Sequence, residues 1–177
     1  MTEEVKRMMT PKYLTGELIE LAVHHVINGL AQPDSVVGKM LKRHDCAVVV
    51  AVPTLPMLEQ SGHPDWGAYP VAPAVYYQET FGDTGKWEIS FDAIAQSKAH
   101  QLWTDRNDDR TDVMPHLLFT GDTIYWGGVK RYGIVVTCSG FQPYFDKMVA
   151  GMIADLVIAL AYHAYMSDLG NRGGFVD

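Results

Sequence analysis

The side chains best suited to metal chemistry in this chain are its seven histidines. A non-haem iron site needs two histidines and a carboxylate on one face, with coordination positions left open for substrate and O2. No histidine forms a His-x-His pair with a following glutamate. His24 and His25 are adjacent on a predicted helix and so point in different directions, and His25 lies on its apolar stripe, as a core histidine would. Others are dispersed along the chain: His63, His100, His116 and His163. The sequence therefore predicts no metal site, while leaving open that distant histidines converge in space.

Ser139 invites a hydrolase interpretation, because it follows an apolar strand and precedes a glycine. A nucleophile elbow has glycines two positions before and two positions after the serine, where this chain has Thr137 and Phe141. The chain also lacks the glycine-rich motifs that bind nucleotide phosphates. We therefore expect Ser139 and Gly140 to form a turn at the end of a strand, and we predict no catalytic residue.

Several aromatic residues stand in predicted loops and turns. Such residues anchor protein interfaces because they are large and rigid and carry a polar tip. We predict an interface with a partner at Trp66, Tyr69, Trp126, Phe141 and Tyr144. Trp66 and Tyr69 are the best of these, because the prolines around them reduce the entropy lost on docking. The alternative is that most of these rings fill the ends of the domain's own core.

Composition and charge narrow the class of protein. The 177 residues suit one domain, and 14 basic against 21 acidic side chains give a net charge of −7. An acidic chain, with a pI near 5.4, is a poor partner for nucleic acid or an anionic membrane. The first residues are charged rather than apolar, and the longest apolar run, Leu156 to Tyr162, is too short to cross a bilayer. Together with Cys46 and Cys138, each in an apolar run that favours a buried reduced thiol, this predicts a cytoplasmic protein.

Apolar periodicity predicts helices near both ends and in the middle of the chain. Thr15 is a candidate N-cap for the first helix, which ends before Pro33, and Ser35 is a candidate cap for a short second helix. The later helices are expected at residues 92–103 and 144–166. Asp155 interrupts the apolar face of the last helix, so we expect it to face solvent or to pair with a base such as Lys98.

Strands are expected where apolar and β-branched residues run together. Residues 46–52 read as a central strand buried on both faces, and residues 75–78 as a second strand. Gly127 and Gly128 are expected to turn the chain from residues 123–126 back into residues 132–138 as a hairpin. Five of the nine prolines fall within residues 53–73, which predicts an ordered arm rather than a strand. Residues 168–177 are expected to form a glycine-rich flexible tail.

The predicted order of elements is α-α-β-β-α-β-β-α. Strands linked by hairpins, with helices between them, indicate an α+β fold with a mostly antiparallel sheet flanked by helices. No internal repeat or linker divides the chain, so residues 1–177 are expected to form a single domain.

The second half of the chain resembles the GlcG/HbpS-like family. The resemblance lies in Ala95-Gln96-Ser97-Lys98-Ala99, in Gly121, in the run from Gly133 to Gly140 and in Asp146 at the start of the last helix. It implies a profilin-like α-β-α sandwich with a proline-rich arm longer than is usual in that family. Some members bind haem, but no axial ligand carries over to a residue of this chain.

By size, arm and overall sequence, the whole chain also resembles the small subunit of the two-component hydroquinone 1,2-dioxygenases. That resemblance implies a non-catalytic, cytoplasmic subunit of an α2β2 assembly, with Fe(II) held by a larger cupin-type subunit. The assembly cleaves the ring of hydroquinone with O2 to 4-hydroxymuconic semialdehyde, in the catabolism of aromatic compounds. Two alternatives remain: a homo-oligomeric GlcG/HbpS-like protein that binds haem or a small aromatic molecule, and a hydrolase that uses Ser139.

Overall fold

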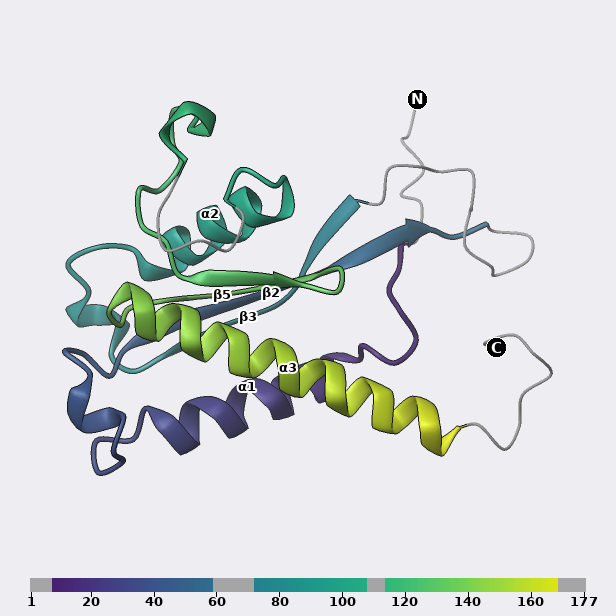
Figure 1. Cartoon of the computed structure of the whole chain (residues 1–177), viewed down its shortest axis with the longest axis horizontal. Helices are drawn as coiled ribbons and strands as arrows, with labels where there is room; N and C mark the ends of the chain where they lie inside the picture. Colours follow the sequence, from purple (N-terminus) through teal and green to yellow (C-terminus); the bar gives the residue numbers. More distant parts are fainter. Residues whose placement is uncertain (1–7, 59–71, 108–113, 169–177) are drawn as a thin grey trace.

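The computed structural model describes residues 8–58, 72–107 and 114–168. In these residues an antiparallel sheet carries α2 (Phe91–Trp103) on one face, and α1 (Gly16–Leu30) and α3 (Pro143–Ser167) on the other (Figure 1). The strands are β1 (Met8–Met9), β2 (Cys46–Pro56), β3 (Ala72–Phe81), β4 (Gly128–Arg131) and β5 (Ile134–Ser139). Short 3-10 helices lie at Gly38–Met40, Thr84–Lys86 and Pro115–Leu117. The predicted α+β class with a mostly antiparallel sheet is confirmed.

β2 is the central strand. It pairs along its length with β3 and β5, and at its end with the short β1. Its side chains alternate between two cores, as the pleat of a strand requires. Cys46, Val48, Val50 and Val52 pack against α1 and α3, whereas Ala47, Val49 and Ala51 pack against α2. The prediction of a strand buried on both faces is thus confirmed, and both cysteines are buried free thiols.

The final hairpin turns later than the glycines at 127 and 128 suggested. Gly128 is the first residue of β4, and the chain turns at Tyr132 and Gly133, between the paired residues Arg131 and Ile134. Both turn residues have positive φ, +47° and +87°, which is the conformation of a two-residue type I′ hairpin. The expected turn was wrong because a tyrosine occupies a backbone conformation that sequence rules reserve for glycine, asparagine and aspartate.

The proline-rich arm is shorter than predicted, because β2 continues to Pro56 and β3 begins at Ala72. Pro53 and Pro73 face each other in register. The ladder of β2 with β5 ends at Ala51 and its ladder with β1 begins at Leu55, so neither of these strands pairs with Pro53. Prolines are tolerated in this stretch of the pair, so assigning all of residues 53–73 to an arm was wrong.

The helices begin and end close to the predicted positions. The Thr15 hydroxyl accepts a hydrogen bond from the backbone N–H of Leu18 at 3.2 Å, which confirms it as the N-cap of α1. The Ser35 hydroxyl similarly accepts from the N–H of Gly38, but the element that follows is one turn of 3-10 helix. Pro143 stands at the start of α3, where its missing N–H has no helical acceptor.

Candidate functional site

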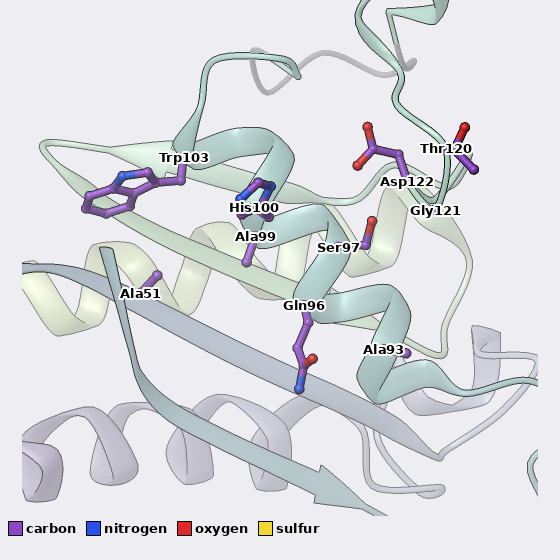
Figure 2. A pocket seen from close by; sticks show the side chains of 10 residues that line it. All are labelled: Ala51, Ala93, Gln96, Ser97, Ala99, His100, Trp103, Thr120, Gly121 and Asp122. Carbon is purple, nitrogen blue, oxygen red and sulfur yellow. The ribbon is translucent and has the colours of Figure 1, made fainter. Parts of the chain in front are cut away.

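A pocket of about 610 Å3 lies over the outward side of α2 (Figure 2). Its lining includes three alanines, the exposed Ala93 of α2 and the nearly buried Ala51 of β2 and Ala99 of α2. His100 and Trp103, one helical turn apart on α2, form one wall. The loop from Thr120 to Asp122 borders the pocket elsewhere. The pocket therefore combines an aromatic surface with a few polar groups, as small-molecule sites do.

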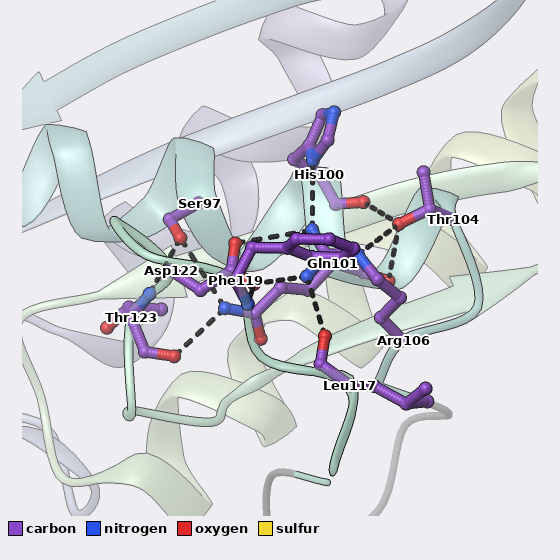
Figure 3. Close-up of polar contacts among 9 residues, drawn as sticks. All are labelled: Ser97, His100, Gln101, Thr104, Arg106, Leu117, Phe119, Asp122 and Thr123. Carbon is purple, nitrogen blue, oxygen red and sulfur yellow. Dashed lines mark hydrogen bonds and ion pairs between the residues drawn. The ribbon is translucent and has the colours of Figure 1, made fainter. Parts of the chain in front are cut away.

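Arg106 ties the loop of this pocket to α2 (Figure 3). Its guanidinium binds both carboxylate oxygens of Asp122, and Nη1 also donates to the carbonyl of Leu117 at 3.1 Å. The backbone N–H of Phe119 donates to the same carboxylate at 2.8 Å. The hydrogen bond from Arg106 is the main cause that lowers the pKa of Asp122 below its ordinary value. Asp122 is thus a paired anion that fixes the loop.

Arg106 also determines which nitrogen of the neutral His100 ring carries the proton. Its Nη2 lies 3.1 Å from Nδ1 of the imidazole (Figure 3). Because a guanidinium can only donate, Nδ1 must accept, and the ring proton of a neutral imidazole then resides on Nε2. His100 therefore presents an N–H donor on the side of the ring away from Arg106.

This tautomer does not suit haem binding in the pocket. A histidine that ligates iron through Nε2 carries its proton on Nδ1 and donates it to a carbonyl or carboxylate. His100 has the opposite arrangement, and it is the one histidine among the described residues that line the pocket. The pocket residues therefore fit a hydrogen-bond acceptor rather than an iron porphyrin.

Ser97 and Gln101 serve the architecture of the pocket. The Ser97 hydroxyl accepts from the backbone N–H of Thr123 at 2.9 Å, and the Gln101 amide donates to the carbonyl of the same residue at 2.9 Å. These two contacts hold the strand-like segment after the loop against α2. Neither side chain hydrogen-bonds to a histidine or a carboxylate within the described residues.

A buried ion pair lies at the other side of α2. The Lys98 ammonium is 3.0 Å from the Asp146 carboxylate and 2.8 Å from the carbonyl oxygen of Cys138, and both charged side chains are almost fully buried. The backbone N–H of Phe141 also donates to Asp146 at 3.0 Å. Burial raises the pKa of Asp146 to about 6, and the Lys98 charge opposes that rise.

The suggested pair of Lys98 with Asp155 was therefore wrong. Asp155 is largely exposed and pairs with Arg131 of β4. The error arose because Lys98 on α2 and Asp146 on α3 are 48 residues apart in the sequence. They meet only because both helices pack on the same sheet. The expectation that Asp155 faces solvent or pairs with a base is confirmed in its general form.

The predicted interface residues differ in their surroundings. Tyr144 is 58% exposed at the start of α3, and Trp126 is half-buried. Phe141 is 8% exposed and belongs to the main core, so its ring packs inside the domain rather than presenting a contact surface. Trp66 and Tyr69 lie outside the described residues. The structure thus leaves Tyr144 as the clearly exposed member of the set.

The histidines also differ from their predicted roles. His25 is exposed, so its assignment to the core was wrong, whereas His24 is half-buried and binds the Glu79 carboxylate at 2.7 Å. Ser139 is 4% exposed at the end of β5. Within residues 8–58, 72–107 and 114–168, no group of three or more histidine, cysteine or acidic side chains is placed to hold a metal ion.

The outward side of α3 is a second candidate site, which sequence reasoning missed. From Met152 onward its exposed residues recur at spacings of three and four positions and so form one stripe: Met152, Asp155, Ala159, Tyr162, His163, Met166 and Ser167. We call this stripe the outer face of α3. Met152, Tyr162 and Met166 are 43%, 63% and 47% exposed. The sequence pattern had placed Met152 on the inner stripe with Met148, Leu156 and Leu160, because a strict spacing of four residues drifts around a helix.

The outer face is poor in charge for a surface in contact with water. Asp155 is its one carboxylate and is paired with Arg131. α3 has a mean hydropathy of 1.6 over its most apolar 18 residues, of which 33% are buried. By length and composition this helix could cross a bilayer. Its longest uninterrupted apolar run, Leu156 to Tyr162, is much shorter than a bilayer span. Since its inner face packs on the sheet and on α1, the outer face is an exposed apolar patch of the kind that marks an interaction surface.

Comparison of the chain with protein-family models, with curated proteins and with solved structures finds no match in any of the three.

Proposed function

We propose that this chain is the non-catalytic small subunit of a hydroquinone 1,2-dioxygenase. In this proposal a larger cupin-type subunit holds Fe(II) and inserts both atoms of O2 into hydroquinone, opening the ring to 4-hydroxymuconic semialdehyde. The small subunit stabilises the large one within a cytoplasmic α2β2 assembly. The α-β-α layering is compatible with a GlcG/HbpS-like, profilin-like fold, and that finer assignment is part of the proposal.

The single observation that carries the partner-dependent part of this proposal is the outer face of α3. A helix that faces water on one side carries polar and charged residues there. Beside the polar Asp155, His163 and Ser167, this outer face exposes two methionines and a tyrosine, each by more than 40%. Methionine and tyrosine are enriched in protein interfaces, and their burial supplies a driving force for association. A large partner subunit that covers the outer face accounts for this composition.

The arrangement of the described residues also supports a role without chemistry of its own. The best-placed titratable groups are engaged in structure, with Asp122 bound to Arg106 and Asp146 bound to Lys98. The Ser139 side chain is buried at a strand end, where a nucleophile has no substrate to attack. The reaction would therefore be assigned to the partner.

Charge substitutions in the outer face test the proposal. Met152→Glu and Tyr162→Glu each place a carboxylate where the partner would bury an apolar group, at a cost of several kcal/mol. We expect each variant to reduce co-purification with the large subunit and ring-cleaving activity, measured by O2 uptake with hydroquinone, by at least tenfold. Val36→Glu is the matched control, because Val36 is 75% exposed and lies in the segment between α1 and β2 rather than on α3. Equal activity of all three variants would contradict docking on this face.

A homo-oligomer without iron would instead support the GlcG/HbpS-like binding protein. The haem form of that alternative has no support from His100, whose tautomer is unsuited to ligation in the pocket.

A further inference from the structure

The pocket over α2 has no role in the proposed subunit contact, which lies on the opposite side of the sheet. Its volume of about 610 Å3 is within the usual range of small-molecule sites.

The first recognition element is the indole of Trp103. It is half-buried, so one part of the ring system is packed and another faces the pocket (Figure 2). Lys130 steadies the residue, because its ammonium donates to the Trp103 carbonyl at 3.1 Å and lies 6.0 Å from the ring centroid. An indole surface in this setting favours a flat, aromatic partner by stacking or edge-to-face contact.

The second element is the N–H donor of His100. Arg106 occupies Nδ1 and so holds the imidazole proton at Nε2. A ligand at this wall can therefore accept a hydrogen bond from His100 through a carbonyl or hydroxyl oxygen.

The third element is the balance of charge. Asp122 borders the pocket, but both its carboxylate oxygens are bound by the Arg106 guanidinium. Among the described lining residues, the pocket thus offers neither an unpaired cation to an anionic ligand nor an unpaired anion to a cationic one. This balance favours a neutral molecule.

We propose that the pocket between α2 and the loop from Thr120 to Asp122 binds a small neutral aromatic molecule that carries an oxygen acceptor. The ring would lie against Trp103 and the oxygen would accept from Nε2 of His100. This inference stands apart from the proposed dioxygenase assembly, since it concerns another face of the chain and holds for the isolated chain as well as for a complex.

Acetophenone is the probe, because it is neutral, aromatic, carries one carbonyl acceptor and does not undergo ring cleavage as a hydroquinone. Three analogues each remove one feature: toluene lacks the acceptor, cyclohexyl methyl ketone lacks the aromatic ring, and benzoate carries a charge. Binding to the full chain is measured by isothermal titration calorimetry and by ligand-observed NMR. We expect acetophenone to bind with a Kd below about 1 mM and each analogue to bind at least fivefold more weakly.

Variants assign the two contacts separately. His100→Phe keeps a ring but removes the donor, so it should weaken acetophenone about fivefold to tenfold and leave toluene unchanged. Trp103→Leu should weaken both, and Trp103→Phe should recover most of the affinity if the leucine variant folds poorly. His25→Phe is the matched control, since this exposed histidine lies on α1 across the sheet.

Three results would overturn the inference: no binding of acetophenone, equal binding of acetophenone and its cyclohexyl analogue, or unchanged affinity in His100→Phe. None of them bears on the association with a large subunit, which is measured separately by co-purification. Failure of the pocket proposal and failure of the proposed function are therefore distinguishable.

Discussion

Replacing Lys98 by methionine removes one member of the buried pair and leaves the Asp146 carboxylate without its cation. Methionine is close to lysine in length, so the change removes charge and hydrogen bonds with little loss of volume. Breaking a buried ion pair in this way costs about 3–5 kcal/mol, because the remaining carboxyl is buried without its cation and must either carry an uncompensated charge or take up a proton. We expect a loss of that size in the free energy of unfolding at pH 7.

The loss should also depend on pH. In the native protein the pKa of Asp146 is about 6. Well above that pH the carboxyl is ionised in both the folded and the unfolded state, so it does not make the free energy of unfolding depend on pH. Without Lys98, burial raises the folded pKa further, and the folded state keeps a proton that the unfolded state has released. Stability of the variant then falls by about 1.4 kcal/mol per pH unit above pH 6, up to about 3 kcal/mol by pH 8.

Urea unfolding followed by far-UV circular dichroism at pH 6, 7 and 8 measures this difference. Lys98→Met/Asp146→Leu should recover most of the stability and lose the slope, because neither buried charge remains. Lys86→Met is the matched control, since Lys86 pairs with Asp83 at 2.9 Å on the surface and should change stability by less than about 1 kcal/mol. A loss below about 1 kcal/mol in Lys98→Met, equal at pH 6 and pH 8, would refute the reasoning.

Two further substitutions test other parts of the structure, both by urea unfolding. Gly133→Ala should cost about 1 kcal/mol, since the φ of +87° strains any side chain although no atom lies within 4 Å of the added methyl carbon; a neutral result would contradict the assigned turn. Arg106→Gln should cost about 1–3 kcal/mol at pH 7 by removing the bonds to Asp122 and Leu117. Its loss should shrink as the pH falls below 4, because the lowered pKa of Asp122 contributes stability that the native protein itself loses on acidification; a loss that stays constant with pH would argue against this pair.

The parts of the fold that sequence predicted well are those set by local patterns. The helix starts at Thr15 and Pro143 follow from capping chemistry, and the run from Cys46 to Val52 has no polar residue that would place it at a surface. The hairpin was misplaced because two glycines at 127 and 128 resemble a turn locally. Gly128 is instead required inside β4, where an added methyl carbon would lie 2.7 Å from side-chain atoms of Leu102 and Thr137.

The sites were less accessible to sequence reasoning, because they depend on contacts between distant segments. Lys98 and Asp146 are 48 residues apart, and nothing in either neighbourhood marks them as partners. The His100 tautomer depends on its contact with Arg106, a residue that follows α2 and carries no motif of its own. The outer face of α3 had a readable signal in the near absence of charge from Met148 to Met166, but its orientation toward solvent follows only from the packing of the opposite face.

The most direct test of the proposed function is the mass and iron content of the chain as purified from its native cells through an affinity tag. The account predicts an equimolar complex with a protein about twice its size, in an α2β2 assembly with one iron per pair, that consumes O2 with hydroquinone. A stable monomer, or a homo-oligomer without iron or ring-cleaving activity, would contradict it.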